Sequence, residues 1–498
     1  MKACVIRNAV SHAQRSNLFP HILCGNKAVF SKNPGVLLRR NIKGVPHFPI
    51  GGKFMKIRLS DHFHYKTLLK FVVPSVCMMV FSSIYGVVDG LFVSNFAGET
   101  PFAAINLLMP FFMILGAVGF MIGAGGSAVV SRTFGEGENE KACSYFTFLV
   151  LFTAIAGTVL AVLGELVLPA VARLFKATDD LYVHGVDYGR IILIGIPFWM
   201  LQTMFQTFFV TAEKSRLGFI VTVISGVTNM VGDALLVGVC DFGVKGAAWA
   251  TILSQFVGAV IPVVFFACKN SSLLRFTKTK FYGKILFETC SNGSSEFVSN
   301  VSSSIVGILF NYRLLALAGE SGVSAFGVLM YVNFIYVAIL LGYSIGVAPV
   351  IGYHYGAKNH GELKSLFKKS LVLTGVTDLI LTVLAEILAA PLSYLFVGKN
   401  PELYSLTRNA FYLYSLCFLF TGFNIFGSAF FTALSNGKVS AAISFLRTVV
   451  FQVAAVLTLP ELMHGINGVW LSVVVAEILS FLVTVVCFIR YRKRYGYA

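Results

Sequence analysis

The chain has 498 residues, of which 56% are hydrophobic and only 12% are charged. Soluble domains of this length do not have such a composition, which is typical of a protein that crosses the bilayer many times. The formal net charge of +17 therefore indicates basic segments beside a membrane and gives no reason to expect a nucleic-acid partner. The nine cysteines form no CxxC pair, so we predict neither a disulfide framework nor a metal site built from them.

The first 54 residues differ from the rest, because they contain many Lys and Arg but no Asp or Glu and no long apolar run. Three interpretations are open: an organelle transit peptide, a cytoplasmic basic tail, or translated sequence upstream of the native start. We favour the third, because the segment that begins at Met55, MKIRLSDHFHYKTLLKF, is itself a basic entry to a first membrane span. We therefore expect residues 1–54 to be disordered or absent from the native protein.

Twelve apolar runs follow, each about as long as the roughly 20 residues that a helix needs to cross a bilayer. With the amino terminus inside, Lys and Arg concentrate in the loops on the inner side, which predicts a multi-pass protein of the cell membrane with both termini in the cytoplasm. A basic cytoplasmic linker, 269–285, separates the sixth and seventh runs. The predicted spans, numbered one to twelve, are 67–94, 103–131, 143–170, 188–212, 219–239, 246–268, 286–316, 325–351, 367–396, 407–433, 439–459 and 467–489.

The chain repeats itself at an offset of about 221 residues. Each half has six spans, an even number, so both halves have the same orientation and are related by an axis along the membrane normal. We predict an all-α polytopic membrane protein with twelve transmembrane helices in two pseudo-symmetric six-helix bundles, an N-lobe (55–268) and a C-lobe (286–498). A two-lobed transporter follows, although duplicated channels also exist. The matching pairs are Gly98-Glu99 with Gly319-Glu320, Gly125 with Gly346, and Phe134-Gly135 with Tyr355-Gly356.

Polar residues interrupt two spans of the first half. Asp89 lies in span one, and Asn229 and Asp233 lie four residues apart on one face of span five, extended by Thr222 and Ser225. A carboxylate in mid-membrane costs roughly 3 kcal/mol or more, so it normally faces a watery cavity or a partner. Hydrogen bonding between helices is one explanation, but two acids and an amide exceed what packing usually needs. In the second half the corresponding residues are Phe310, Val450 and Ala454, so we expect this cluster in the first half alone.

The second half has three charged residues within its spans: Glu296 in span seven, Arg447 in span eleven and Glu477 in span twelve. An arginine in mid-span needs a nearby acid. A structural Glu–Arg pair and a role with substrate or proton are both open. Glu296 and Arg447 are secondary candidates for a functional site.

Five stretches of the chain carry a family resemblance: IYGVVDGLFVSNFAG (84–98), GGSAVVSRTFGEG (125–137), NMVGD (229–233), GAAWATILSQ (246–255) and VAPVIGYHYGAKN (347–359). In these stretches and their order the chain resembles the multidrug and toxic compound extrusion family, a branch of the lipid-flippase and polysaccharide-exporter superfamily. The resemblance implies an antiporter that expels bulky, often cationic or amphipathic organic compounds in exchange for Na⁺ or H⁺. It places the coupling cation at Asp89, Asn229, Asp233 and Thr251.

Oxygen ligands of this kind suit Na⁺, a hard cation, and we expect Na⁺ to be favoured. Two close acids can instead hold a proton near neutral pH. Some relatives also place an acid deep in span seven and another in span ten. Here span seven has Ser303 and Ser304 in that region, and span ten has no acid.

The alternatives to a drug antiporter are a flippase, a membrane enzyme and a channel. A flippase of lipid-linked sugars needs a basic cavity, to which only Arg447 and Arg313 can contribute. A membrane enzyme is not expected, because HExxH and paired Asp-rich loops are missing. A duplicated channel is the third. The expected partners are the lipid bilayer, a small organic substrate and the coupling cation, without a cofactor, and we expect the protein to function as a monomer.

Overall fold

The structure, a computed structural model, describes residues 57–96, 99–174 and 179–498, so the basic leader 1–54 lies outside the described residues. The regular structure in these ranges is helical, and eleven of the helices there are long and apolar enough to cross a membrane. The elements are α2 (Tyr65–Phe96), α3 (Glu99–Gly135), α4 (Asn139–Leu174), α5 (Asp179–Thr211), α6 (Ser215–Asp233), η1 (Ala234–Val239), α7 (Gly243–Ala267), α8 (Gly283–Gly356), α9 (His360–Val397), α10 (Pro401–Tyr414), η2 (Ser415–Cys417), α11 (Phe418–Ala433), α12 (Gly437–Phe445), η3 (Leu446–Phe451), α13 (Gln452–Leu462) and α14 (Asn467–Tyr495).

Helix α8 contains two membrane spans. Its 74 residues would extend about 110 Å if straight, far beyond the roughly 30 Å core of a bilayer. The helix is broken at Gly319, where φ is 60° and ψ is −151°, a conformation that glycine adopts at little cost because it has no Cβ. The break separates the predicted spans seven and eight. With it, the eleven long helices account for all twelve predicted spans.

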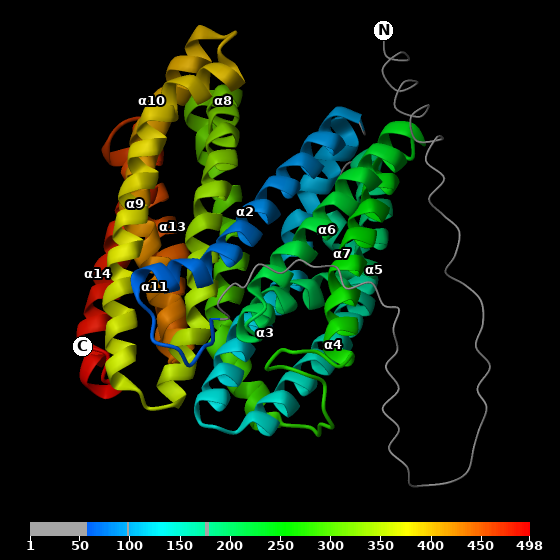
Figure 1. The fold of residues 1–498 in the computed structure, drawn as a ribbon. Helices are drawn as coiled ribbons and strands as arrows, with labels where there is room; N and C mark the ends of the chain where they lie inside the picture. The colour runs from blue at the N-terminus through cyan, green and yellow to red at the C-terminus, as the bar shows by residue number, and fades with distance from the viewer. Residues whose placement is uncertain (1–56, 97–98, 175–178) are drawn as a thin grey trace, which may run out of the picture. The chain divides into compact units, whose positions relative to one another are not determined.

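The helices form two bundles, as predicted. In the first half, α5 packs against α3, α4 and α7, and α6 packs against α2 and α7. In the second, α11 packs against α9, α12 and α14, and α13 packs against α14 (Figure 1). The most buried spans are α5 and the continuous α10–η2–α11 segment. These segments are predicted spans four and ten, which are equivalent in the repeat. The most buried span is therefore the same one in each bundle.

The two halves meet where α3 packs against α8, and glycines permit the approach. A Cβ on Gly135 would lie 2.0 Å from the carbonyl oxygen of Tyr353, and one on Gly356 would lie 2.1 Å from that of Arg132. Gly135 and Gly356 are equivalent in the repeat, and so are Arg132 and Tyr353. The two contacts are therefore related by the pseudo-twofold axis, and small residues are what close helix–helix approach in membranes requires.

Gly356→Ala is expected to destabilise the protein by about 1–3 kcal/mol, because the added methyl group overlaps backbone that cannot move aside easily. Gly307→Ala, in the same helix α8, is the matched control, since nothing lies within 4 Å of a Cβ at that position. Thermal unfolding of the purified variants in detergent measures the difference. Equal unfolding temperatures for the two variants would contradict the contact.

The segment that precedes α2 is attached to both halves. Leu59 and Phe63 are fully buried. The backbone N–H of Leu59 donates to Oε1 of Glu213 at 2.8 Å, and the N–H of Phe63 donates to Oε1 of Glu362 at 2.9 Å. The side chain of His62 also pairs with Glu362. Glu213 follows α5 of the first half and Glu362 lies in the first turn of α9, so this segment bridges the two halves.

Candidate functional site

The polar stripe predicted in span five lies on the buried face of α6. Thr222, Ser225, Asn229 and Asp233 are all buried, and the last two are 2% and 0% exposed. Asp233 is the last residue of α6, and the π-helical turn η1 follows it directly. Such turns occur frequently at functional sites, because they shift the side chains of a helix relative to its regular spacing. The stripe therefore ends in a carboxylate beside an irregular turn.

The structure brings Asp89 of α2 to this stripe. The Asn229 amide Nδ2 donates to the Asp89 carboxylate Oδ1 at 3.5 Å, at the long limit of a hydrogen bond. The carboxyl groups of Asp89 and Asp233 are also close enough to interact with each other. Three of the four predicted cation-site residues thus come together from helices that are far apart in the sequence.

Several oxygen atoms of this cluster have no hydrogen-bond donor. Oδ1 of Asn229 and both carboxylate oxygens of Asp233 are buried without a partner. Buried polar atoms are nearly always paired, so three unpartnered acceptors side by side are unusual. Acceptors of this type are satisfied by a cation, by a proton or by a hydrogen-bond donor such as water, and a site with two acids among them favours a positively charged species. No group of three or more His, Cys, Asp or Glu among the described residues fits a metal ion, so the cluster does not resemble a transition-metal site.

Thr251 has a less direct place in the cluster. It is half-buried on α7, and within the described part of the chain its hydroxyl makes no hydrogen bond to Asp89, Asn229 or Asp233. Its helix nevertheless comes close, because a Cβ on Gly232 would lie 2.8 Å from the Cβ of Ala250. A role for Thr251 as a cation ligand stays a prediction.

Two tyrosines beside the acids were not predicted from the sequence. Tyr85 lies one helical turn before Asp89 and interacts with it, and Tyr188 of α5 interacts with both Asp89 and Asp233. The i, i+4 spacing of Tyr85 and Asp89 is visible in the sequence. Tyr188 belongs to another helix, and no spacing rule connects it to either acid. Both tyrosines therefore lie in the surroundings of the acids, although among the described residues neither hydroxyl bonds to them directly.

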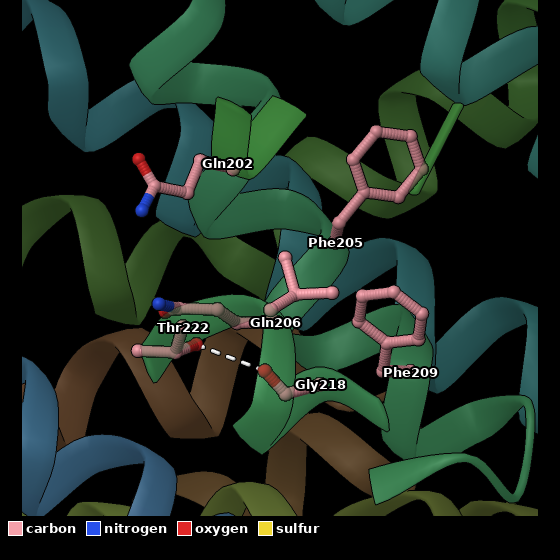
Figure 2. A pocket seen from close by; sticks show the side chains of 8 residues that line it. Gln202, Phe205, Gln206, Phe209, Gly218 and Thr222 are labelled. Carbon is pink, nitrogen blue, oxygen red and sulfur yellow. Dashed lines mark hydrogen bonds between the residues drawn. The ribbon is translucent and has the colours of Figure 1, made fainter. Parts of the chain in front are cut away.

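A small pocket lies between α5, α6 and α7, on the same polar face. Figure 2 shows the amide of Gln206 beside Thr222, whose hydroxyl donates to the carbonyl of Gly218 at 3.0 Å, with Gln202 farther along the same wall. The Gln202 amide Nε2 also donates to the hydroxyl of Ser225 at 3.0 Å. The cavity has a volume of about 10 Å³, room for about one water molecule, so it is not a binding site for a bulky organic compound as it stands.

The charged residues of the second half form their own cluster. Nε of Arg447 lies 2.8 Å from Oε1 of Glu477, and Nδ2 of Asn424 donates to Oε2 of the same carboxylate at 2.7 Å. Glu296 lies near enough to Arg447 to interact with its charge. Glu477 is thus the nearby acid that was expected for Arg447, and Glu296 is a second neighbour.

A further acid of this cluster, Asp378 of α9, was not singled out in the sequence. It is 1% exposed and interacts with both Glu477 and Arg447. The second half thus contains a buried acid beyond those predicted, at a position that is not equivalent to Asp89, Asn229 or Asp233. Fold symmetry does not explain either cluster, because the positions equivalent to Asp378 and Arg447 in the first half are Gly157 and Gly226.

Comparisons with known proteins agree with this architecture. A family model described as MatE matches the chain twice, over residues 74–235 and 296–457, in register with the internal repeat. The multidrug export protein MepA of Staphylococcus saprophyticus is 23% identical over 423 residues, which cover 83% of this chain and 91% of that protein. MepA of Staphylococcus aureus is 24% identical over 430 residues, which cover 84% and 92%.

Solved structures show the same fold. An outward-facing conformation of a multidrug resistance MATE family transporter has a TM-score of 0.81 and 22% identity, and covers 87% of this chain and 97% of that chain. A crystal structure of MATE in complex with MaL6 gives the same values. At this identity the likeness concerns the fold, and it supports the two-bundle architecture described above.

Proposed function

Because this chain belongs to the MatE family, whose model matches both of its halves, we propose that it is an antiporter of the plasma membrane. It exports organic, often cationic or amphipathic, drug-like compounds in exchange for a small cation. The curated relatives are multidrug export proteins, which supports this class of substrate. The observation that carries the cation coupling is the cluster of unpartnered oxygens on Asn229 and Asp233 beside Asp89.

The coupling ion is Na⁺ or H⁺, and both fit the chemistry of this cluster. Two carboxylates and an amide oxygen are hard donors of the kind that Na⁺ prefers. The same two acids can share one proton, because two like charges in a medium of low dielectric constant resist simultaneous ionisation. The number of unpartnered acceptors favours Na⁺, since one proton satisfies only one oxygen pair.

Alternating access follows from neutralisation of the acids. A cation bound at Asp89 and Asp233 removes the repulsion between them and allows α2 to move against α6. Helix α2 contains Pro74, which removes a backbone hydrogen bond. It also contains Gly86 and Gly90, around which nothing lies within 4 Å of a Cβ. Export then requires that cation and drug favour different states of the protein.

Proteoliposomes test the coupling directly. The purified protein is reconstituted, ethidium is supplied as a cationic aromatic probe, and an inward Na⁺ or H⁺ gradient is imposed separately. We expect ethidium to move against its own gradient under one of the two ion gradients. Ethidium flux that only equilibrates, whatever the ion gradient, would indicate a channel and overturn the antiport proposal.

A flippase of lipid-linked sugars is less well supported, because the two arginines that it requires are engaged. Arg447 pairs with Glu477, and Nη2 of Arg313 lies 2.6 Å from Oε1 of Glu461. Both guanidinium groups are thus already paired with an acid in this structure.

A further inference from the structure

Asp378 is a buried acid with no ion-pair partner of its own. Its side chain is 1% exposed. Its carboxylate oxygens make no hydrogen bond of normal geometry, although the backbone N–H groups of Gly422 and Phe423 of α11 lie beside them. It lies tightly against α11, since a Cβ on Gly422 would be only 2.1 Å from Oδ1. An ionised carboxylate in this position would be an uncompensated buried charge, which costs several kcal/mol.

Among the described residues, the one cation that interacts with Asp378 already has an ion-pair partner. Arg447 of η3 is paired with Glu477 of α14, whose second oxygen is held by Asn424. The other titratable groups of this cluster are Cys417 of η2, which interacts with Asp378, and Glu296 and Tyr414, which interact with Arg447. Arg447 thus lies near three acids, and in this structure it pairs with Glu477.

We propose that Asp378 is a proton-binding site in the second half of the protein, and that Arg447 alternates between Glu477 and Asp378 according to its occupancy. When Asp378 carries a proton, it is neutral and Arg447 stays with Glu477. When the carboxyl O–H bond breaks and the proton passes to water, Arg447 turns towards the new carboxylate. Arg447 lies within a π-helical turn, an irregularity that is frequent at functional sites.

The binding of a proton at Asp378 does not depend on the proposed function, which concerns the first half, but its use in transport does. Infrared spectroscopy of the purified protein detects the carbonyl band of a protonated carboxylic acid. We expect a component of this band at neutral pH that is lost in Asp378→Asn and kept in Asp180→Asn, a control at an exposed position of α5. The band should also disappear reversibly as the pH is raised.

A band that is unchanged in Asp378→Asn would overturn the proposal. So would a band that persists up to the pH at which the protein unfolds, because Asp378 would then be a permanently neutral structural residue. If the band behaves as expected while proteoliposomes show no coupled export, the proposed function fails and this site stands.

A second variant tests the alternation of Arg447. Glu477→Gln removes the competing acid, so Arg447 becomes available to Asp378. The double variant Glu477→Gln/Arg447→Met is the reference, because it lacks the same negative charge and has no arginine. We expect the band of Asp378 to be lost about one pH unit lower or more in Glu477→Gln than in the double variant, the usual effect of a nearby arginine on an acid. Loss of the band at the same pH in both variants would show that Arg447 does not turn to Asp378 and would overturn the alternation.

Discussion

Asp89→Asn is expected to reduce gradient-driven export of ethidium by about tenfold or more while the amount of protein in the membrane is unchanged. Asn has nearly the same shape as Asp but no negative charge, so packing is retained and the cation loses one of its two acids. Coupling free energies of 1–3 kcal/mol correspond to 5–150-fold effects, which sets the size of the expected loss. Transport in proteoliposomes and immunoblots of membranes measure the two quantities.

Asp180→Asn is the matched control for this substitution, because it removes an acid from an exposed position of the same half. We expect it to export ethidium at the wild-type rate. Asp233→Asn should reproduce the loss seen for Asp89→Asn, since the two carboxyl groups are neighbours. Wild-type export by either site variant would mean that the coupling ion binds elsewhere.

Arg447→Met is expected to destabilise the protein by roughly 3–5 kcal/mol, because it leaves the Glu477 carboxylate buried without its cation. The double variant Arg447→Met/Glu477→Leu should recover most of this loss, since both charges are then removed. Unfolding temperatures in detergent and a double-mutant cycle measure the coupling between the two side chains.

Arg313→Met provides a comparison for the same chemical change. Arg313 also pairs with an acid, but that acid, Glu461, is 73% exposed, so the loss of its partner is compensated by solvent. We expect a cost of less than about 1 kcal/mol there. Equal effects of the two arginine substitutions would show that the burial of Glu477 does not matter.

The spans and the repeat could be predicted because they depend on local composition. Apolar length alone sets the number of spans, and the orientation of each half follows from an even number of them. The helices differ from the predicted spans in two ways: spans five, ten and eleven contain the short irregular turns η1, η2 and η3, and spans seven and eight form a single broken helix, α8. The break depends on the backbone conformation of Gly319, which its residue type permits but does not require.

The candidate site could be predicted only in part. Asn229 and Asp233 share a helix face by spacing, whereas their approach to Asp89 depends on how α2 packs against α6. Tyr188 reaches the same acids from a third helix. Asp378 was missed for a related reason: a single acid in an apolar run has no neighbour within its own helix, and its importance comes from Glu477 and Arg447, about 70 to 100 residues later.

The segment before α2 limits how far the two halves can part at that end of the molecule. Leu59 is held by Glu213 and Phe63 by Glu362, and the four residues of chain between these anchors reach at most about 14 Å when fully stretched. Any conformation that moves the ends of α5 and α9 farther apart than this length must break the hydrogen bond to one of the two carboxylates. The two halves can therefore separate only up to this length, and any further separation requires that one of these hydrogen bonds breaks.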